Sequence, residues 1–142
     1  MKFKERLLQG TFVKRYKRFF VDIEYNNKII TGHCPNPGSM MGLLNTGNKV
    51  WFSKSDNSSR KLKYTLEIIE VEKKMVGINT LLTNKIVLEA LNYKKINSLI
   101  KFNDINTEVK FSLNTRFDFL LLNNKEKCFL EVKNVTLVRE KK

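Results

Sequence analysis

Three charged residues lie inside two short segments of the sequence that are otherwise apolar. Asp118 occurs in RFDFLLL, and Glu131 and Lys133 occur in CFLEVKN. Two carboxylates can hold a hard cation such as Mg2+, because such ions prefer oxygen ligands. A bound cation polarises a phosphodiester, and a neighbouring ammonium group stabilises the negative charge that develops there. These residue types fit magnesium-dependent cleavage of a phosphodiester, with Asp118, Glu131 and Lys133 as the candidate catalytic residues.

The turn between the two segments decides whether the three charges share a face. Residues 123–126 are the polar break between the apolar runs, and a four-residue turn there predicts three pairs: Leu122–Lys127, Leu120–Phe129 and Asp118–Glu131. Paired residues on antiparallel strands lie on one face, with Cβ atoms about 5 Å apart. Lys133, two residues past Glu131, points to the same face. A one-residue slip would scatter these groups, so the alternative is the solvated edge of an ordinary hairpin.

A helix is expected before these strands. The segment LTNKIVLEALNY predicts a helix that begins near Asn84. Four of its residues fall along one stripe: Ile86, Glu89, Ala90 and Tyr93. If that stripe faces the sheet, Glu89 joins Asp118 and Glu131 as a candidate metal ligand; otherwise it lies on the solvated side of the helix. With strands expected at MVGINT, EVKFSL, TRFDFLLL and CFLEVKNVTLV, residues 75–142 predict an α/β or α+β module.

The first half of the chain predicts short strands joined by tight turns. Strands are expected at FVDIEY, KIITGH, KVWFS and YTLEIIEVE. Alternation around the first of these places four residues on one face of the strand: Phe19, Val21, Ile23 and Tyr25. The dipeptide Asn26-Asn27 predicts a hairpin turn, because Asn tolerates positive φ. Several strands with short connections predict a small OB-like β-barrel over residues 1–74.

The net charge of the chain points to a polyanionic partner. There are 27 Lys and Arg against 14 Asp and Glu, which gives a net charge of +13. A charge of this size favours nucleic acid. In KRYKRFF (14–20), pairs of basic residues are interleaved with aromatic ones, a pattern that suits a surface that follows phosphates and stacks bases. The alternative is a lysine-rich proteome in which such charges are merely solvated.

Candidate DNA contacts come from three segments. The basic stretch KRYKRFF supplies four, with Phe19 assigned to the barrel core. The polar loop KSDNSSRK extends the basic patch, and the turn-rich loop HCPNPGSM offers an imidazole and backbone amides to a phosphate. A purely structural role for that last loop is the alternative. The predicted DNA-binding residues are Lys14, Arg15, Lys17, Arg18, Arg60, Lys61, His33, Asn36 and Ser39.

Other features exclude several classes of protein. No stretch of about 20 apolar residues is present, as a membrane span would need. The N-terminal MKFKERLLQG lacks the long apolar core of a signal peptide. Cys34 and Cys128 have no partner spacing, so neither a disulfide framework nor a zinc site is indicated. Reduced thiols predict a cytoplasmic protein.

The sequence resembles the sugar fermentation stimulation protein family. The resemblance rests on stretches that occur in order over almost the whole chain: KRYKRF (14–19), HCPNPGSM (33–40), SDNSSRK (55–61), VGINTLLTNKIVLEAL (76–91), and RFDFLLL with CFLEVKNVTLV (116–138). It implies an OB-like domain followed by a nuclease-like domain of the PD-(D/E)XK type. Members of the family continue for many tens of residues beyond a segment like VREKK, so the second domain is expected to be incomplete.

The resemblance also implies roles for particular residues. Asp118 matches the Asp of the PD-(D/E)XK motif, and Glu131 and Lys133 match its Glu-x-Lys. Glu89 matches the acidic residue on the first helix of such folds. The family is regarded as DNA-binding, with a proposed regulatory role in sugar (maltose) metabolism. DNA binding is therefore the expected function, and magnesium-dependent cleavage of DNA is the alternative.

Overall fold

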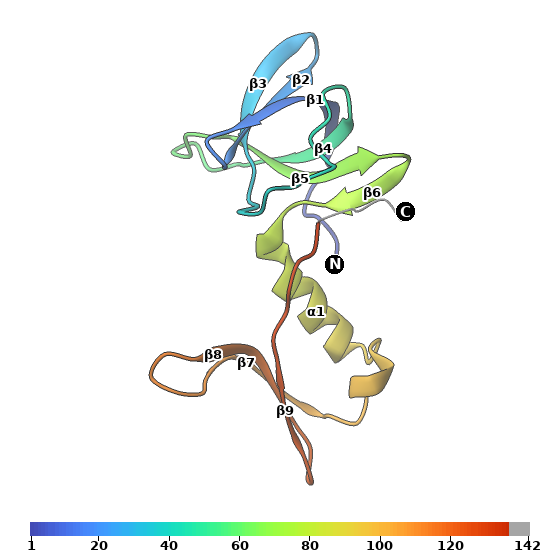
Figure 1. Cartoon of the computed structure of the whole chain (residues 1–142), viewed down its shortest axis with the longest axis vertical. Helices are drawn as coiled ribbons and strands as arrows, with labels where there is room; N and C mark the ends of the chain where they lie inside the picture. Colours follow the sequence, from blue (N-terminus) through green and yellow to red (C-terminus); the bar gives the residue numbers. More distant parts are fainter. Residues whose placement is uncertain (137–142) are drawn as a thin grey trace. The chain divides into compact units, whose positions relative to one another are not determined.

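The computed structural model describes residues 1–136, which divide into two compact units, each with its own apolar core (Figure 1). The first unit contains Lys2–Thr80 and residues 135–136. The second unit contains Met1 and Leu81–Asn134. Each unit is described by itself.

The boundary between the units differs from the one expected from the sequence. The sequence predicts that the second domain begins at residue 75. In the structure, β6 (Lys74–Gly77) pairs with β5 (Tyr64–Val71), so this strand belongs to the first unit. The reason is the turn Glu72-Lys73, whose φ values of 50° and 64° join the two strands as a tight hairpin.

Six strands of the first unit form one sheet that closes into a barrel (Figure 1). Their order is β3-β2-β1-β4-β5-β6, and a parallel pairing of β3 with β5 closes the first five into a ring. This is the predicted OB-like barrel, which the structure confirms. The strands not yet named are β1 (Leu8–Tyr16), β2 (Phe20–Tyr25), β3 (Lys28–His33) and β4 (Lys49–Lys54).

Alternate residues of these strands supply the barrel core. Phe12, Phe52 and Leu66 are each at most 1% exposed. Burying such a side chain contributes about 1.5–3 kcal/mol. The register shifts between Phe12 and Lys14 and between Trp51 and Phe52, and shifts of this kind bend a strand so that a sheet can close.

The hairpin between β2 and β3 has the turn predicted for it. Asn26 and Asn27 have φ values of 51° and 59°, and Tyr25 pairs with Lys28 across them. Two successive positive φ values define a turn whose twist matches that of the flanking strands. The hairpin turn predicted at Asn26-Asn27 is therefore confirmed.

The second unit consists of a helix and a three-stranded antiparallel sheet of order β7-β8-β9. Its core contains Leu91, Phe102, Phe119 and Leu121, each at most 4% exposed. The predicted combination of one helix with a strand meander is confirmed. The elements are η1 (Thr80–Leu82), α1 (Thr83–Asn92), η2 (Asn97–Leu99), β7 (Asp104–Lys110), β8 (Arg116–Leu122) and β9 (Lys127–Leu130).

The helix begins where the sequence predicts, but a different stripe faces the sheet. Ile86 is 50% exposed and Tyr93 is 70% exposed, so the predicted stripe is wrong. Val87, Leu88 and Leu91 pack into the core instead. Their spacing of one, three and four residues is that of an apolar helix face.

The β8–β9 hairpin has the register expected from its turn. The structure contains the two predicted pairs Leu122–Lys127 and Leu120–Phe129. Continuing the same register would place Asp118 opposite Glu131, but β9 ends at Leu130. The sequence predicts a strand that runs on to Val138, of which residues 137 and 138 lie outside the described part. Within residues 1–136, no helix has the length and apolar character required to cross a membrane.

Candidate nucleic-acid interface and charged hairpin

A row of side chains runs across the five strands of the closed barrel. The pairing register joins, strand by strand, Tyr16, Phe20, His33, Thr65 and Ser53. Paired residues lie on the same face of a sheet. The residues next to them along the chain, Val21, Phe52 and Leu66, are fully buried in the core. The row therefore lies on the outside of the barrel, and we refer to these five residues as the outer row.

The aromatic end of the outer row lies beside a lysine. The rings of Tyr16 and Phe20 stack with centroids 5.5 Å apart. Lys14 Nζ lies 5.4 Å from the Tyr16 centroid and 3.6 Å from Asp22 Oδ2. Asp22 also accepts hydrogen bonds from Thr31 (2.8 Å) and Tyr16 (3.3 Å). Lys14, a predicted DNA contact, is thus partnered, although its side chain remains 65% exposed.

The turn between β1 and β2 presents Phe19 at the surface. Lys17 and Arg18 have φ values of 45° and 63°, and the Phe19 amide donates to the Lys17 carbonyl (2.7 Å). A hydrogen bond between residues i and i+2 around a positive φ marks a strained γ-turn. Phe19 is 40% exposed, with its ring centroid 6.2 Å from that of His33. The prediction that Phe19 belongs to the core is wrong, because this turn carries its side chain away from the barrel interior.

Arg15 fastens this turn to the loop that follows β3. Its Nε donates to the Arg18 carbonyl (2.7 Å), Nη2 to the Asn36 carbonyl (2.6 Å), and Nη1 to the carbonyls of Gly38 (2.8 Å) and Ser39 (3.4 Å). The planar guanidinium suits such a set of acceptors. The sequence predicts Arg15 as a DNA contact, whereas in the structure its guanidinium binds the protein backbone.

The two predicted contacts in the loop differ in accessibility. Asn36 is 3% exposed, donates to the Ile78 carbonyl (3.2 Å), and accepts from the Gly38 amide (2.9 Å). Its side chain therefore shapes the loop. Ser39 is exposed and lies where Arg15 holds the backbone.

The middle of the outer row carries an imidazole beside a guanidinium. Arg60 Nη2 donates to Thr65 Oγ1 (2.8 Å), and Thr65 pairs with His33. Burial and the positive charge of Arg60 together lower the pKa of His33 below its ordinary value. His33 is therefore neutral near pH 7, and one ring nitrogen can accept a hydrogen bond. Lys61, next in the chain, is exposed. The structure thus brings His33 and Arg60 together from distant segments.

Three residues near this site, Ser53, Thr65 and Glu67, are not predicted by the sequence. Glu67 is 6% exposed and accepts hydrogen bonds from Ser53 (2.6 Å) and Asn79 (2.8 Å). Ser53 and Thr65 belong to the outer row only because β3 pairs with β5 and β5 with β4. No local signal reveals such a pairing, since it joins strands distant in sequence.

Asp118 is held by two hydrogen bonds inside the second unit. Asn84 Nδ2 donates to Oδ1 and the Val132 amide donates to Oδ2, both at 2.7 Å. The β7–β8 pairing skips Asp118 and its counterpart Glu108, whose φ is 53°. This irregularity allows both Asp118 and the next residue, Phe119, to line one cavity of about 190 Å3 beside α1. Asp118 is therefore fixed in orientation at the edge of a small cavity.

Glu131 and Lys133 form an exposed ion pair close to Asp118. Lys133 Nζ lies 2.5 Å from Glu131 Oε1. This hydrogen bond, together with the negative charges of Glu131 and Asp118, raises the pKa of Lys133 above its ordinary value. The three predicted catalytic residues thus interact electrostatically, and Lys133 is protonated at neutral pH.

Glu89, the third predicted metal ligand, has a different partner. Its carboxylate forms an ion pair with the N-terminal amino group of Met1. From the same helix, Asn84 contacts Asp118. Within residues 1–136, no group of three or more His, Cys, Asp or Glu side chains lies close enough together to hold a metal ion. A site built from Asp118, Glu131 and Glu89 stays a prediction.

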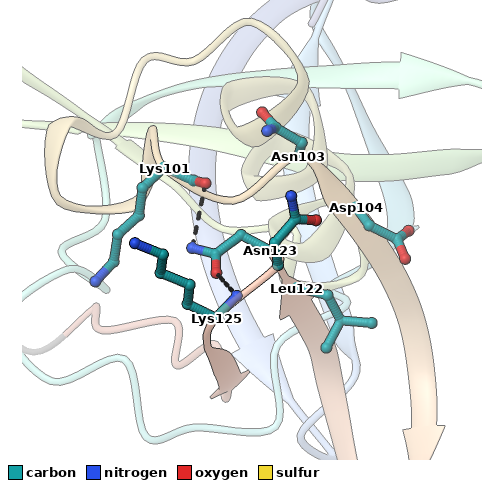
Figure 2. Close-up of a pocket in the computed structure, with 7 residues that line it drawn as sticks. Lys101, Asn103, Asp104, Leu122, Asn123 and Lys125 are labelled. Atoms are coloured by element: carbon teal, nitrogen blue, oxygen red, sulfur yellow. Dashed lines mark hydrogen bonds between the residues drawn. The ribbon is translucent and has the colours of Figure 1, made fainter.

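A larger open pocket, of about 500 Å3, lies at the tip of the β8–β9 hairpin (Figure 2). Asn123 organises it: its Oδ1 accepts from the Lys125 amide (2.8 Å) and its Nδ2 donates to the Lys101 carbonyl (3.4 Å). The Lys101 ammonium is paired with Glu126. No predicted site residue lines this pocket, which is formed by Lys101, Asn103, Asp104, Leu122, Asn123, Asn124 and Lys125.

Comparison with known protein families agrees with an OB barrel joined to a second domain. Residues 13–78 match the family model described as SfsA N-terminal OB domain. Residues 81–142 match the model described as Sugar fermentation stimulation protein RE domain. Together the two matches cover nearly the whole chain. The chain belongs to the sugar fermentation stimulation protein family.

Individual relatives are longer than this chain. It is 52% identical over 142 residues to the Sugar fermentation stimulation protein homolog of Pelagibacter ubique, covering the whole chain but 61% of that relative. It is 44% identical to the homolog of Maricaulis maris, covering 95% of the chain and 58% of that relative. The chain thus spans about three-fifths of the length of these curated relatives.

A solved structure shares the fold. It is described as "The structure of Pyrococcus Furiosus SfsA in complex with Ca2+", and it is 22% identical with a TM-score of 0.77. The match covers 94% of this chain and 56% of that one. At this level of identity the likeness shows the fold alone.

Proposed function

We propose that this protein binds DNA through the outer row of its barrel and the basic residues beside it. The observation that carries the proposal is the juxtaposition of stacked aromatics, an imidazole and cations on one face. Tyr16 and Phe20 stack, His33 follows them in the row, and Arg60 lies beside His33. Aromatic surfaces flanked by cations are how OB folds hold nucleic acid. DNA binding in the cytoplasm is the activity by which a member of this family would regulate genes for sugar (maltose) metabolism.

Phosphate contacts should dominate this binding. The chain carries a net charge of +13, and α1, the α-helix among the described elements, packs its apolar face into the core of the second unit. Neutralising phosphates releases counterions, so the logarithm of the affinity falls linearly with the logarithm of the salt concentration. Affinity should therefore drop steeply between low and physiological salt.

The experiment is fluorescence anisotropy of a labelled DNA oligonucleotide over a series of salt concentrations, with wild type and two charge variants. Arg18→Ala should weaken binding about 3- to 10-fold and reduce the salt slope by about 1, because a phosphate contact is lost. Lys28→Ala is the matched control. Its pair Tyr25–Lys28 lies five residues along β2 from Phe20–His33, about 17 Å away. Equal effects of the two substitutions, or an affinity insensitive to salt, would contradict the proposal.

A second candidate function is magnesium-dependent cleavage of DNA at the charged hairpin. The observation that favours it is the hydrogen bond from the Val132 amide to Asp118 (2.7 Å), which brings Asp118 close to the Glu131–Lys133 ion pair on either side of Val132. Carboxylate oxygens are the donors that Mg2+ and Ca2+ prefer, so Asp118 and Glu131 fit such an ion, with water or phosphate oxygens completing its coordination. A relative of this fold was solved with Ca2+, which is consistent with a divalent cation here. When bound, Mg2+ would supply electrophilic activation of the phosphodiester.

The chain's own residues have distinct tasks in this candidate reaction. Asn84 and the Val132 amide orient Asp118. Lys133, protonated at neutral pH, stabilises negative charge on the phosphate oxygens. The test has two readouts: calorimetric titration of Mg2+ into wild type and Asp118→Asn, and the loss of intact DNA on gels. Cation binding and cleavage that both disappear in Asp118→Asn would support a nuclease; cation binding unchanged by the substitution would exclude this site.

A further inference from the structure

We infer that Phe19, together with His33 of the outer row, binds unpaired DNA bases, so that this protein prefers single-stranded segments to duplex. The inference deepens the proposed function and rests on it. Phe19 lies in the turn between β1 and β2, and its side chain is 40% exposed. Its carbonyl accepts a hydrogen bond from the Cys34 amide (2.8 Å), so the backbone at this exposed ring is fixed.

The turn that presents Phe19 is strained and held from two sides. Lys17 and Arg18 both have positive φ, a conformation that long side chains rarely adopt. Strain of this kind persists only where the surrounding structure enforces it, and it is concentrated at binding sites. Arg15 binds the Arg18 carbonyl on one side of the turn, and Cys34 binds the Phe19 carbonyl on the other. The ring is therefore pre-organised at the surface before a ligand arrives.

The groups next to Phe19 suit a base and its phosphate. The His33 ring is tilted by 38° against that of Phe19, at a centroid distance of 6.2 Å. His33 is neutral near pH 7, so it can share a hydrogen bond with a base edge without needing a counter-charge. Arg60 lies beside His33 and Arg18 beside Phe19, and both carry positive charge for the flanking phosphates. Stacking surface, hydrogen-bonding group and cations thus occur within one short stretch of the barrel surface.

The preference for single-stranded over duplex DNA follows from which base faces the Phe19 ring can contact. In a duplex, each base is already stacked between its neighbours and paired, so its face cannot contact Phe19. In a single strand the base faces are free, and every base has one, so stacking on an aromatic side chain is tolerant of sequence. Phosphate contacts alone favour the duplex, because its charge density is higher than that of a single strand. The preference for unpaired DNA should therefore depend on the Phe19 ring.

The experiment compares a labelled oligo-dT of about 20 nucleotides, longer than the site of one OB fold, with a duplex of the same length at one salt concentration. Wild type should bind the single strand at least about tenfold more tightly than the duplex. Phe19→Ala should weaken single-strand binding about tenfold and leave duplex binding unchanged. Phe19→Leu, which keeps apolar bulk without a π face, should weaken single-strand binding as Phe19→Ala does. Phe19→Trp, which keeps a π face, should bind the single strand as tightly as wild type. Tyr93→Ala, which removes a ring 70% exposed at the end of α1 in the second unit, is the matched control and should change neither affinity.

The possible results separate the inference from the proposed function. Equal affinity for single strand and duplex, with neither changed by Phe19→Ala, overturns the inference and leaves DNA binding intact. Failure of wild type to bind either form at low salt overturns both. Thermal unfolding of each variant is recorded first; because Phe19 is exposed and its backbone hydrogen bonds do not depend on its ring, the variants should fold as wild type does.

Discussion

At the scale of single residues, the surroundings of a side chain determine what it does. Arg15 and Arg18 are three positions apart in one basic stretch, yet the guanidinium of Arg15 binds backbone carbonyls while Arg18 is exposed. Asp118 is fixed by two donors, whereas Glu131 is exposed and paired with Lys133. Residue type alone does not separate these roles. A given side chain has the same charge and length whether it is exposed to solvent or hydrogen-bonded to the protein.

His33 offers a direct test at this scale, because it is the only histidine in the chain and gives a single imidazole signal. Its NMR titration midpoint should lie below 6.5, since burial and Arg60 both disfavour the charged ring. Arg60→Ala should raise the midpoint, and Lys28→Ala should leave it unchanged. A midpoint at or above 6.5 in wild type would contradict the geometry described for Arg60 and His33.

The same shift has a consequence for stability. The folded pKa of His33 lies below its unfolded value, so the unfolded chain binds more protons between the two values. The stability that this group contributes is complete above pH 6.5 and falls as the pH drops through that interval. In urea denaturation, His33→Gln should therefore show a smaller loss of stability than wild type between pH 7 and pH 5.

At the scale of elements, the candidate interface depends both on strand register and on hydrogen bonds between loops. The strands set the outer row through their register. The β1–β2 turn and the loop after β3, however, are joined by one side chain, Arg15, and by the bond from the Cys34 amide to the Phe19 carbonyl. A guanidinium can span several carbonyls because its donors form a rigid planar fork.

Removing the guanidinium of Arg15 should destabilise the first unit measurably. Arg15→Ala should lower the free energy of unfolding by about 2–3 kcal/mol, since charge-assisted hydrogen bonds to backbone carbonyls are lost. Arg15→Lys should recover less than half of the loss, because one ammonium cannot span the same carbonyls. Lys17→Ala, at an exposed position of the same turn, should change stability by no more than about 0.5 kcal/mol. Urea denaturation gives all three values. An Arg15→Ala variant as stable as wild type would show that the hydrogen bonds of Arg15 to the backbone do not stabilise the first unit.

At the scale of the whole molecule, two separate cores imply two units that unfold independently. The barrel core includes Leu66 and the core of the helix and three-stranded sheet includes Leu121, both fully buried. The cores share no residue. Cooperative units of this kind can open separately in hydrogen exchange.

A pair of matched substitutions tests this independence. Leu66→Ala and Leu121→Ala each remove the same buried atoms, and each should destabilise its own unit by about 2–5 kcal/mol. In hydrogen exchange, Leu66→Ala should accelerate the amides of β1–β6 and spare those of α1 and β7–β9. Leu121→Ala should do the reverse. Faster exchange throughout the chain in both variants would mean that the two units unfold as one.

The sequence by itself determined the features whose causes lie within a few residues. Asn26 and Asn27 tolerate positive φ, so the β2–β3 turn follows from two side chains. The polar break at 123–126 sets the register of the β8–β9 hairpin, and the alternation of short strands predicts a barrel. These features depend on backbone preference and local pattern, which a chain carries before it folds.

Tertiary structure alone decided the composition of the sites. The outer row exists because β3 pairs with β5, and Asp118 meets Asn84 across 34 positions of sequence. Phe19 is exposed because the strained turn before it turns its ring outward, although the alternation of apolar residues predicts burial. Contacts between distant segments arise from how whole sheets and helices pack, and many packings share the same local pattern. The chemistry of individual residues was therefore readable from the sequence, while their partners were not.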